Sequence, residues 1–162
     1  MQTTTLGRTG RTVSVAGLGC GGSSKVGMTR GLSQAESIAL VREAIDRGVT
    51  LIDTAEAYGT EDIVGGALAG IDRDTITVST KSGYRHADGL MRASEVIANL
   101  EGSLRRLRLD TIDVFQVHAV RPAHYAYVMD EIVPALLDQK ARGTVRHIGI
   151  TETPPNDPRQ MV

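Results

Sequence analysis

The sequence predicts an α/β fold in which parallel strands alternate with helices. Short β-branched segments typical of buried strands alternate with longer segments whose apolar residues recur at helical spacing. The 18 glycines fall mostly at the ends of these segments, where the chain changes direction. Strands that alternate with helices pair in parallel through right-handed crossovers. We therefore expect one layer of parallel strands covered by helices.

The expected strands follow one another at regular intervals. Residues 3–6 and 12–15 flank a turn at 8–11, which predicts an N-terminal hairpin. The second arm of this hairpin is expected to continue into a first buried strand at 13–18. Four further strands are predicted at 49–52, 75–80, 111–117 and 145–150.

Caps and breaks mark the helices between these strands. The segment SQAE at 33–36 matches the capping box, so a helix begins after Ser33, and Gly48 ends it. Proline lacks the N–H that a helix interior needs, so Pro134 is expected to break or restart the last helix. The other helices are predicted at 61–68, 97–107 and 124–142.

The length of the chain limits how much of a closed barrel it can form. A (β/α)8 barrel, or TIM barrel, needs roughly 250 residues, whereas this chain has 162 and five predicted barrel strands. We therefore expect a partial barrel in a single domain, 1–162: the hairpin plus five parallel strands with intervening helices. Residues 151–162 are expected to form a loop and the start of another helix. The open sheet would have two exposed edges, which favours a fragment of a longer enzyme or self-association through these edges.

The composition argues against several classes of partner. The chain has 18 basic and 19 acidic residues, which supply no field for nucleic acid, and the run RRLR at 105–108 is expected to face solvent at a helix end. No apolar run is long enough to span a membrane. The single cysteine, Cys20, and a polar N-terminus favour the cytoplasm. The histidine and cysteine spacings match no metal site.

Chemically active side chains gather where the predicted strands end. Ligands bind at the carboxyl ends of the strands in parallel α/β arrays. An acid, a phenol, an ammonium and an imidazole on three consecutive strand ends predict an acid–base site. The residues at or just beyond the five strand ends are Gly21, Gly22, Asp53, Tyr58, Lys81, His118, Thr151 and Glu152.

At these residues the chain resembles the aldo-keto reductase family. The segments GVTLIDTAEAYGTEDIVGGAL, VSTKSG, SLRRLRLDTIDVFQVH and VRHIGIT carry the resemblance, which extends from the hairpin to about residue 152. The family is one of NADPH-dependent carbonyl reductases on a (β/α)8 barrel, so the resemblance implies a small-molecule aldehyde or ketone as substrate. The catalytic residues it implies are Asp53, Tyr58, Lys81 and His118. The cofactor-binding residues it implies are Gly21, Gly22, Asp53, Thr151 and Glu152.

The chemistry of carbonyl reduction suits the four implied catalytic residues. Hydride transfer builds negative charge on the carbonyl oxygen, and Tyr58 can supply the proton that neutralises it. The ammonium of Lys81 would favour the phenolate left behind, and Asp53 would hold that ammonium in place. His118 would donate a hydrogen bond to the carbonyl oxygen and so orient the substrate.

Two alternatives remain open at this stage. Lys81 at a strand end could form a Schiff base, as in barrel aldolases. The chain could instead be a catalytically incomplete half barrel, or a non-catalytic module that needs another chain. Family strands six to eight, which carry much of the cofactor site, have no counterpart here, and Glu152 lacks an amide donor. The pattern GxGxxG at 17–22 opens into no helix, so we interpret it as a strand-to-loop junction.

Overall fold

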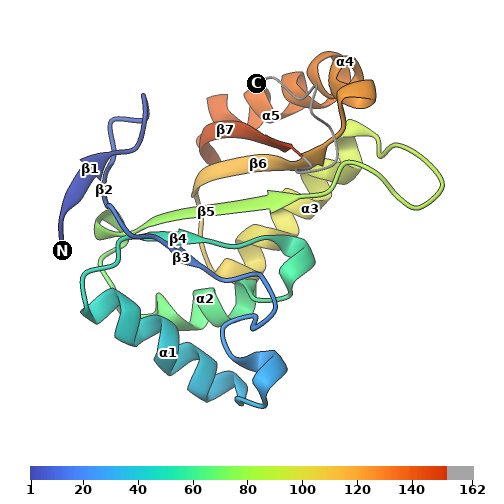
Figure 1. The fold of residues 1–162 in the computed structure, drawn as a ribbon. Helices are drawn as coiled ribbons and strands as arrows, with labels where there is room; N and C mark the ends of the chain where they lie inside the picture. Colours follow the sequence, from blue (N-terminus) through green and yellow to red (C-terminus); the bar gives the residue numbers. More distant parts are fainter. Residues whose placement is uncertain (153–162) are drawn as a thin grey trace.

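The computed structural model describes residues 1–152, and the predicted loop and helix start beyond them lie outside the described residues. Within residues 1–152, seven strands form a small hairpin and a larger sheet (Figure 1). The strands are β1 (Thr3–Thr5), β2 (Thr12–Ser14), β3 (Leu18–Gly19), β4 (Leu51–Asp53), β5 (Thr77–Ser82), β6 (Ile112–Val120) and β7 (Val145–Glu152).

Helices connect the strands of the larger sheet. The α-helices are α1 (Gln34–Asp46), α2 (Glu61–Ala67), α3 (Ala93–Leu107), α4 (Tyr125–Tyr127) and α5 (Val133–Ala141). Ser33 begins α1 through the predicted capping box. Pro134 lies in the first turn of α5, where no N–H is needed, and a π-helical turn at Val128–Ile132 precedes it. Short 3-10 turns occupy Met28–Arg30, Glu56–Tyr58, Arg73–Thr75 and Pro122–His124.

The larger sheet is parallel and its strands lie in chain order, β3-β4-β5-β6-β7. The helices surround the outer side of this curved sheet (Figure 1). Val78, Phe115 and Val117 of the sheet are buried in one apolar cluster with Leu100 and Leu107 of α3. The predicted fold, a hairpin followed by five parallel strands of a partial barrel, is confirmed.

The first predicted strand is wrong in one respect. Residues 13–18 do not form a continuous strand, because the chain bends between β2 and β3. The Ser14 hydroxyl donates to the Ala16 carbonyl at 2.7 Å and accepts the Thr50 N–H at 2.9 Å. These side-chain hydrogen bonds replace strand pairing at the bend. The hairpin is consequently a separate two-stranded sheet.

The last two strands run further than expected. Strand β6 continues to Val120 and pairs with Glu152 of β7 after an irregularity between Val117 and Val120. His118 therefore lies inside β6, and Thr151 lies inside β7, where the sequence had predicted positions beyond the strand ends. Lys81 likewise is the penultimate residue of β5.

A buried carboxylate fastens the hairpin to the amino ends of the strands. Asp113 is fully buried and accepts the Val78 N–H at 2.8 Å. The guanidinium of Arg73 binds the same carboxylate, and that of Arg11 lies 3.8 Å from it. Arg11 also donates to the Thr77 hydroxyl at 2.8 Å. Because a buried charge needs charged or hydrogen-bonded partners, this cluster fixes the hairpin against the sheet.

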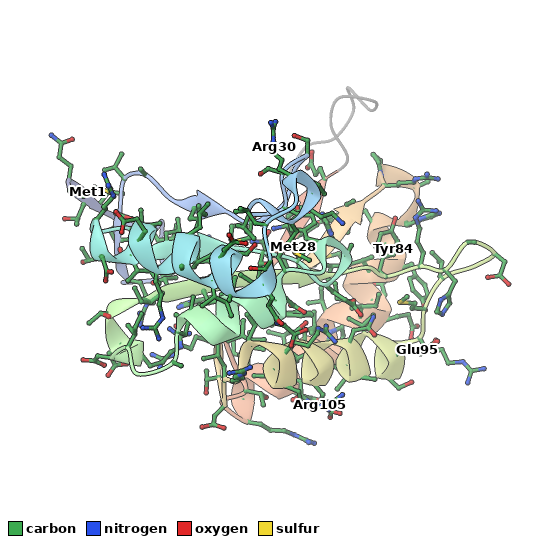
Figure 2. The ribbon with its side chains drawn as sticks, turned by 90° about the horizontal axis from the view of Figure 1, so that it is seen from below. Met1, Met28, Arg30, Tyr84, Glu95 and Arg105 are labelled. Atoms are coloured by element: carbon green, nitrogen blue, oxygen red, sulfur yellow. The ribbon has the colours of Figure 1, made fainter. Side chains whose placement is uncertain are left out.

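A second buried carboxylate joins α2 to α3 and the sheet. Glu61 is buried, and its two oxygens accept from the Thr80 hydroxyl at 2.6 Å and from Arg106 Nε at 2.7 Å. The prediction that residues 105–108 face solvent is therefore wrong for Leu107, which is buried, and holds only in part for Arg106, whose side chain turns to Glu61 and stays 35% exposed. Arg105 does extend from the outer side of α3 (Figure 2). Helix geometry gives the reason, because successive residues point to different faces.

The close approach of α2 to α3 depends on Gly65. A Cβ at this position would lie 2.4 Å from the Arg106 carbonyl oxygen, which is backbone and cannot move aside. We expect Gly65→Ala to lower the free energy of unfolding by about 1–3 kcal/mol, as measured by urea denaturation.

The neighbouring Gly66 supplies the matched control. A Cβ there would meet the end of the Ile38 side chain, which can rotate. Alanine also favours a helix over glycine by about 1 kcal/mol, so Gly66→Ala should cost little. Equal stability of the two variants would contradict this account of the α2–α3 contact.

Candidate active site

The site is built around an ion pair between neighbouring strands. Asp53 ends β4 and pairs in register with Ser79 of β5. Lys81 is two residues beyond Ser79 on β5, so its side chain lies on the same face of the sheet. Lys81 Nζ donates to Asp53 Oδ1 at 2.8 Å, to Asp53 Oδ2 at 2.7 Å and to the Thr54 carbonyl at 3.0 Å. The Lys81 side chain is only 7% exposed, against 43% for Asp53. The structure thus brings these two predicted residues together.

Tyr58 lies beside this ion pair. It ends the 3-10 turn that follows β4, and Lys81 Nζ is 5.2 Å from the centre of its ring. The His118 ring meets the Tyr58 ring edge-on, with the ring centres 5.7 Å apart and an angle of 85° between the planes. The four predicted catalytic residues therefore form one cluster at the carboxyl ends of β4, β5 and β6. A phenol, an ammonium, a carboxylate and an imidazole in contact can transfer and stabilise a proton.

His118 is half-buried, and its surroundings disfavour its charged form. Burial lowers the pKa of His118 below its usual 6.5, and the Lys81 ammonium lowers it further, while Asp53 partly opposes both. The ring is therefore neutral near pH 7. A neutral imidazole carries one N–H, which can donate a hydrogen bond to an oxygen without adding a charge.

The residue after His118 has an unusual backbone conformation. Ala119 has φ = 58°, in the left-handed region that side-chain-bearing residues rarely adopt. Its N–H donates to the Thr151 hydroxyl of β7 at 2.8 Å. The sequence predicted Thr151 as a cofactor-binding residue, and the structure gives its hydroxyl oxygen this contact with the strand that carries His118. The neighbouring Glu152 pairs with Val120.

Gly21 and Gly22, the other predicted cofactor-binding residues, differ in their surroundings. A Cβ at Gly21 would lie 2.6–2.9 Å from three atoms of the Tyr58 ring, so this glycine packs directly against the phenol. A Cβ at Gly22 would meet no atom within 4 Å, and its φ of +70° favours glycine for conformational reasons. The structure therefore links Gly21 to the placement of Tyr58, whereas a cofactor-binding role for either glycine stays a prediction.

Cys20 lies beneath the site and is fully buried. Its N–H donates to the Asp53 carbonyl at 2.8 Å. The pKa of the Cys20 thiol is raised to about 12, mainly by burial and in smaller part by Asp53, while Lys81 partly offsets the two. The thiol is therefore an inert part of the core at neutral pH.

Three residues near the site escaped the sequence analysis. Ser79 and Gln116 face the same side of the sheet as Lys81. Ser79 donates a hydrogen bond to Asp53, and Gln116 donates one to Ser79. The sequence did hold a signal for both residues, because side chains two apart on a strand share a face. Ser79 stands two positions before Lys81, and Gln116 stands two positions before His118. Tyr84 is buried, and its hydroxyl lies 3.0 Å from His124 Nδ1 and accepts the Arg121 N–H at 3.1 Å. It joins the loop after β5 to the segment after β6.

The described part of the chain offers neither a cluster of metal-binding side chains nor a helix that could span a membrane. Within residues 1–152, no group of three histidine, cysteine, aspartate or glutamate side chains is arranged to hold a metal ion. No helix formed by these residues is long and apolar enough to cross a membrane.

Comparison with known proteins identifies the family. The sequence model of the Aldo/keto reductase family matches residues 17–161. Aldo-keto reductase YhdN of Bacillus subtilis is 35% identical over 93% of this chain and 47% of its own length. L-galactose dehydrogenase of Arabidopsis thaliana is 34% identical over 92% of this chain and 48% of its own length. The chain belongs to the aldo/keto reductase family, and it spans about half the length of these curated relatives.

Solved structures agree with this assignment. The holo form of aldo-keto reductase AKR11C1 from Bacillus halodurans matches 96% of this chain and 52% of its own, with a TM-score of 0.78 at 30% identity. An aldo-keto reductase from Klebsiella pneumoniae in complex with NADPH matches 87% of this chain and 46% of its own, with a TM-score of 0.69 at 30% identity. The partial barrel thus corresponds to about half of each of these proteins.

The contact between Gly21 and Tyr58 can be tested with a pair of glycine variants. We expect Gly21→Ala to displace the Tyr58 ring, because the added Cβ would overlap it. Gly19→Ala is the control, since a Cβ there meets no atom within 4 Å. NMR of the chain with labelled tyrosine rings should show the Tyr58 signal shifted in Gly21→Ala and unchanged in Gly19→Ala. Identical tyrosine spectra for both variants would refute the contact.

The burial of Cys20 leads to a second expectation. At about pH 8 a thiol with a strongly raised pKa is almost wholly protonated, so the folded chain should react very slowly with a disulfide reagent such as DTNB. The chain has one cysteine, so concentrated guanidinium should release one equivalent of reactive thiol. Rapid reaction of the folded chain would show that Cys20 is accessible.

Proposed function

We propose that this chain carries the acid–base half of a carbonyl reductase site. In the proposed reaction an aldehyde or ketone is reduced by hydride transfer from NADPH, and Tyr58 protonates the carbonyl oxygen. The observation that carries the proposal is the hydrogen-bonded pair of Lys81 and Asp53 directly beside the Tyr58 ring, with the His118 ring edge-on to it.

The proposed roles follow from charge and position. When Tyr58 gives up its proton, the nearby Lys81 ammonium stabilises the phenolate. Asp53 holds that ammonium in place through two hydrogen bonds. The neutral His118 can donate its N–H to the carbonyl oxygen and so orient the substrate. These roles require no movement of the four residues out of the observed cluster.

The surroundings of Tyr58 also fit the nicotinamide end of NADPH. The space beside Gly22 is open, and Asp53 is partly exposed at the same end of the sheet. We propose that Gly21, Gly22, Asp53 and Thr151 line this end of the cofactor, with Glu152 at its rim. NADPH supplies the hydride when bound. A relative from Klebsiella pneumoniae has been solved with NADPH, which supports this choice of cofactor.

The Schiff-base alternative is less well supported by the geometry. A Schiff base needs a neutral lysine amine as nucleophile, whereas Lys81 donates to three acceptors as an ammonium would. Borohydride trapping with a carbonyl substrate separates the two mechanisms. An aldolase would become covalently modified at Lys81, and a reductase would not.

The half-barrel alternative concerns what the chain does unaided. The matched relatives are about twice as long as the aligned region, and the edges β3 and β7 offer surfaces for self-association or for another chain. We propose the cytoplasm as the compartment, because the buried free thiol of Cys20 suits reducing conditions.

The first experiment is a titration of the purified chain with NADPH. The chain has no tryptophan, so the emission of the nicotinamide itself reports binding. Saturable binding in the micromolar range would support a working cofactor site, and size-exclusion chromatography in the same buffer would show whether an assembly forms it. An absence of binding at millimolar NADPH would favour the half-barrel alternative.

The proton donor is tested by removing one hydroxyl. We expect Tyr58→Phe to lower kcat for carbonyl reduction by about 100-fold or more, because general acid catalysis contributes at least this much. Binding of NADPH should stay at the parent level. Tyr125→Phe removes a hydroxyl from an exposed tyrosine and is the matched control. Reduction by Tyr58→Phe at the parent rate would refute the assignment.

A further inference from the structure

A chain of hydrogen bonds between side chains leads to the ion pair from the middle of the sheet. Gln116 Nε2 of β6 donates to Ser79 Oγ of β5 at 2.9 Å. Ser79 Oγ donates to Asp53 Oδ1 of β4 at 3.0 Å. Asp53 in turn accepts from Lys81 through both oxygens. Three neighbouring strands thus contribute to one network.

The direction of each hydrogen bond in this network is fixed by chemistry. The amide nitrogen of Gln116 can only donate, so Ser79 Oγ accepts from it. The single hydroxyl proton of Ser79 is then left for Asp53, whose ionised carboxylate can only accept. Both hydrogen bonds therefore run toward the Asp53 carboxylate. Gln116 fixes the orientation of the Ser79 hydroxyl, and Ser79 fixes that of the carboxylate.

The backbone holds the members of the network in line. Asp53 lies opposite Ser79 in the sheet register, and Lys81 lies opposite Gln116. On the far side Gln116 lies opposite Gly149 of β7, where a Cβ would come within 3.1 Å of Gln116 Cγ. The small residue at 149 therefore leaves the room that the Gln116 side chain occupies.

We propose that Ser79 and Gln116 are positioning residues for the ion pair of Lys81 and Asp53. The Asp53 side chain is 43% exposed, so water competes for its oxygens, and rotation about its terminal bond is intrinsically soft. The donor from Ser79 fixes that rotation, so that both oxygens stay turned toward Lys81. The role of these two residues in catalysis rests on the proposed reductase function, but the placement of Lys81 is a property of the folded chain.

The test uses the small number of lysines. The sequence has only Lys25, Lys81 and Lys140, so a chain labelled with 15N-lysine gives a simple spectrum of side-chain ammonium groups. The Lys81 ammonium is held by three acceptors, and its protons should exchange slowly with water. Loss of one hydrogen bond behind it is expected to raise this exchange rate by about five- to tenfold in Ser79→Ala.

Four further variants make the result specific to the network. Gln116→Leu should raise the exchange rate less than Ser79→Ala does, and the double variant should match Ser79→Ala alone, because Gln116 acts only through Ser79. Ser79→Thr keeps a hydroxyl and should restore slow exchange. Thr80→Val removes a neighbouring hydroxyl that binds Glu61 instead, so it should lower stability without changing the Lys81 signal.

The outcomes separate this proposal from the proposed function. An unchanged Lys81 exchange rate in folded Ser79→Ala would overturn it, as would an equal effect of Thr80→Val. If Ser79→Ala does not fold, Gln116→Leu decides by the same criterion. These signals need no turnover, so a chain without reductase activity tests the proposal equally well. Where reduction is measurable, kcat should fall in Ser79→Ala while the KM for NADPH stays at the parent value.

Discussion

The ammonium of Lys81 is the charge around which this end of the structure is organised. It is nearly excluded from water, and a buried ammonium is stable only when its protons find acceptors. Asp53 and the Thr54 carbonyl supply these acceptors from the end of the neighbouring strand. The turn that follows then brings Tyr58 over the same cation. The short β4 strand and its turn therefore determine most of the geometry of the site.

A second ionic centre occupies the opposite end of the sheet. Asp113, near the start of β6, is buried among arginines of the hairpin, of the Arg73–Thr75 turn and of β7. The apolar cluster around Phe115 and Val117 lies along the strand between the two charged regions. Polar groups at both ends of the strands limit sliding of one strand past another, because a shift in register would leave buried charges without partners. The candidate site is thus carried by rigid elements, as precise chemistry requires.

The sequence predicted that the candidate residues lie together better than it predicted the backbone that supports them. The clustering of Asp53, Lys81 and His118 was predictable because strand ends and family motifs coincide at these positions. The bend at Ser14 could not be found, since it depends on a hydroxyl that contacts Thr50, far away in the sequence. Hydrogen bonds between strands depend on register, and register follows from the packing of the whole sheet, which local patterns do not encode.

The left-handed backbone of Ala119 has a consequence for which strands hold the site together. Such a conformation costs roughly 1–2 kcal/mol for a residue with a side chain, and the hydrogen bond from its N–H to the Thr151 hydroxyl helps to hold it. Thr151 belongs to β7, the last strand of the described sheet to be synthesised. The Thr151 hydroxyl reaches the Ala119 N–H because β7 pairs with β6 at this end of the sheet. A strand that carries none of the four clustered residues thus helps to hold the backbone next to His118.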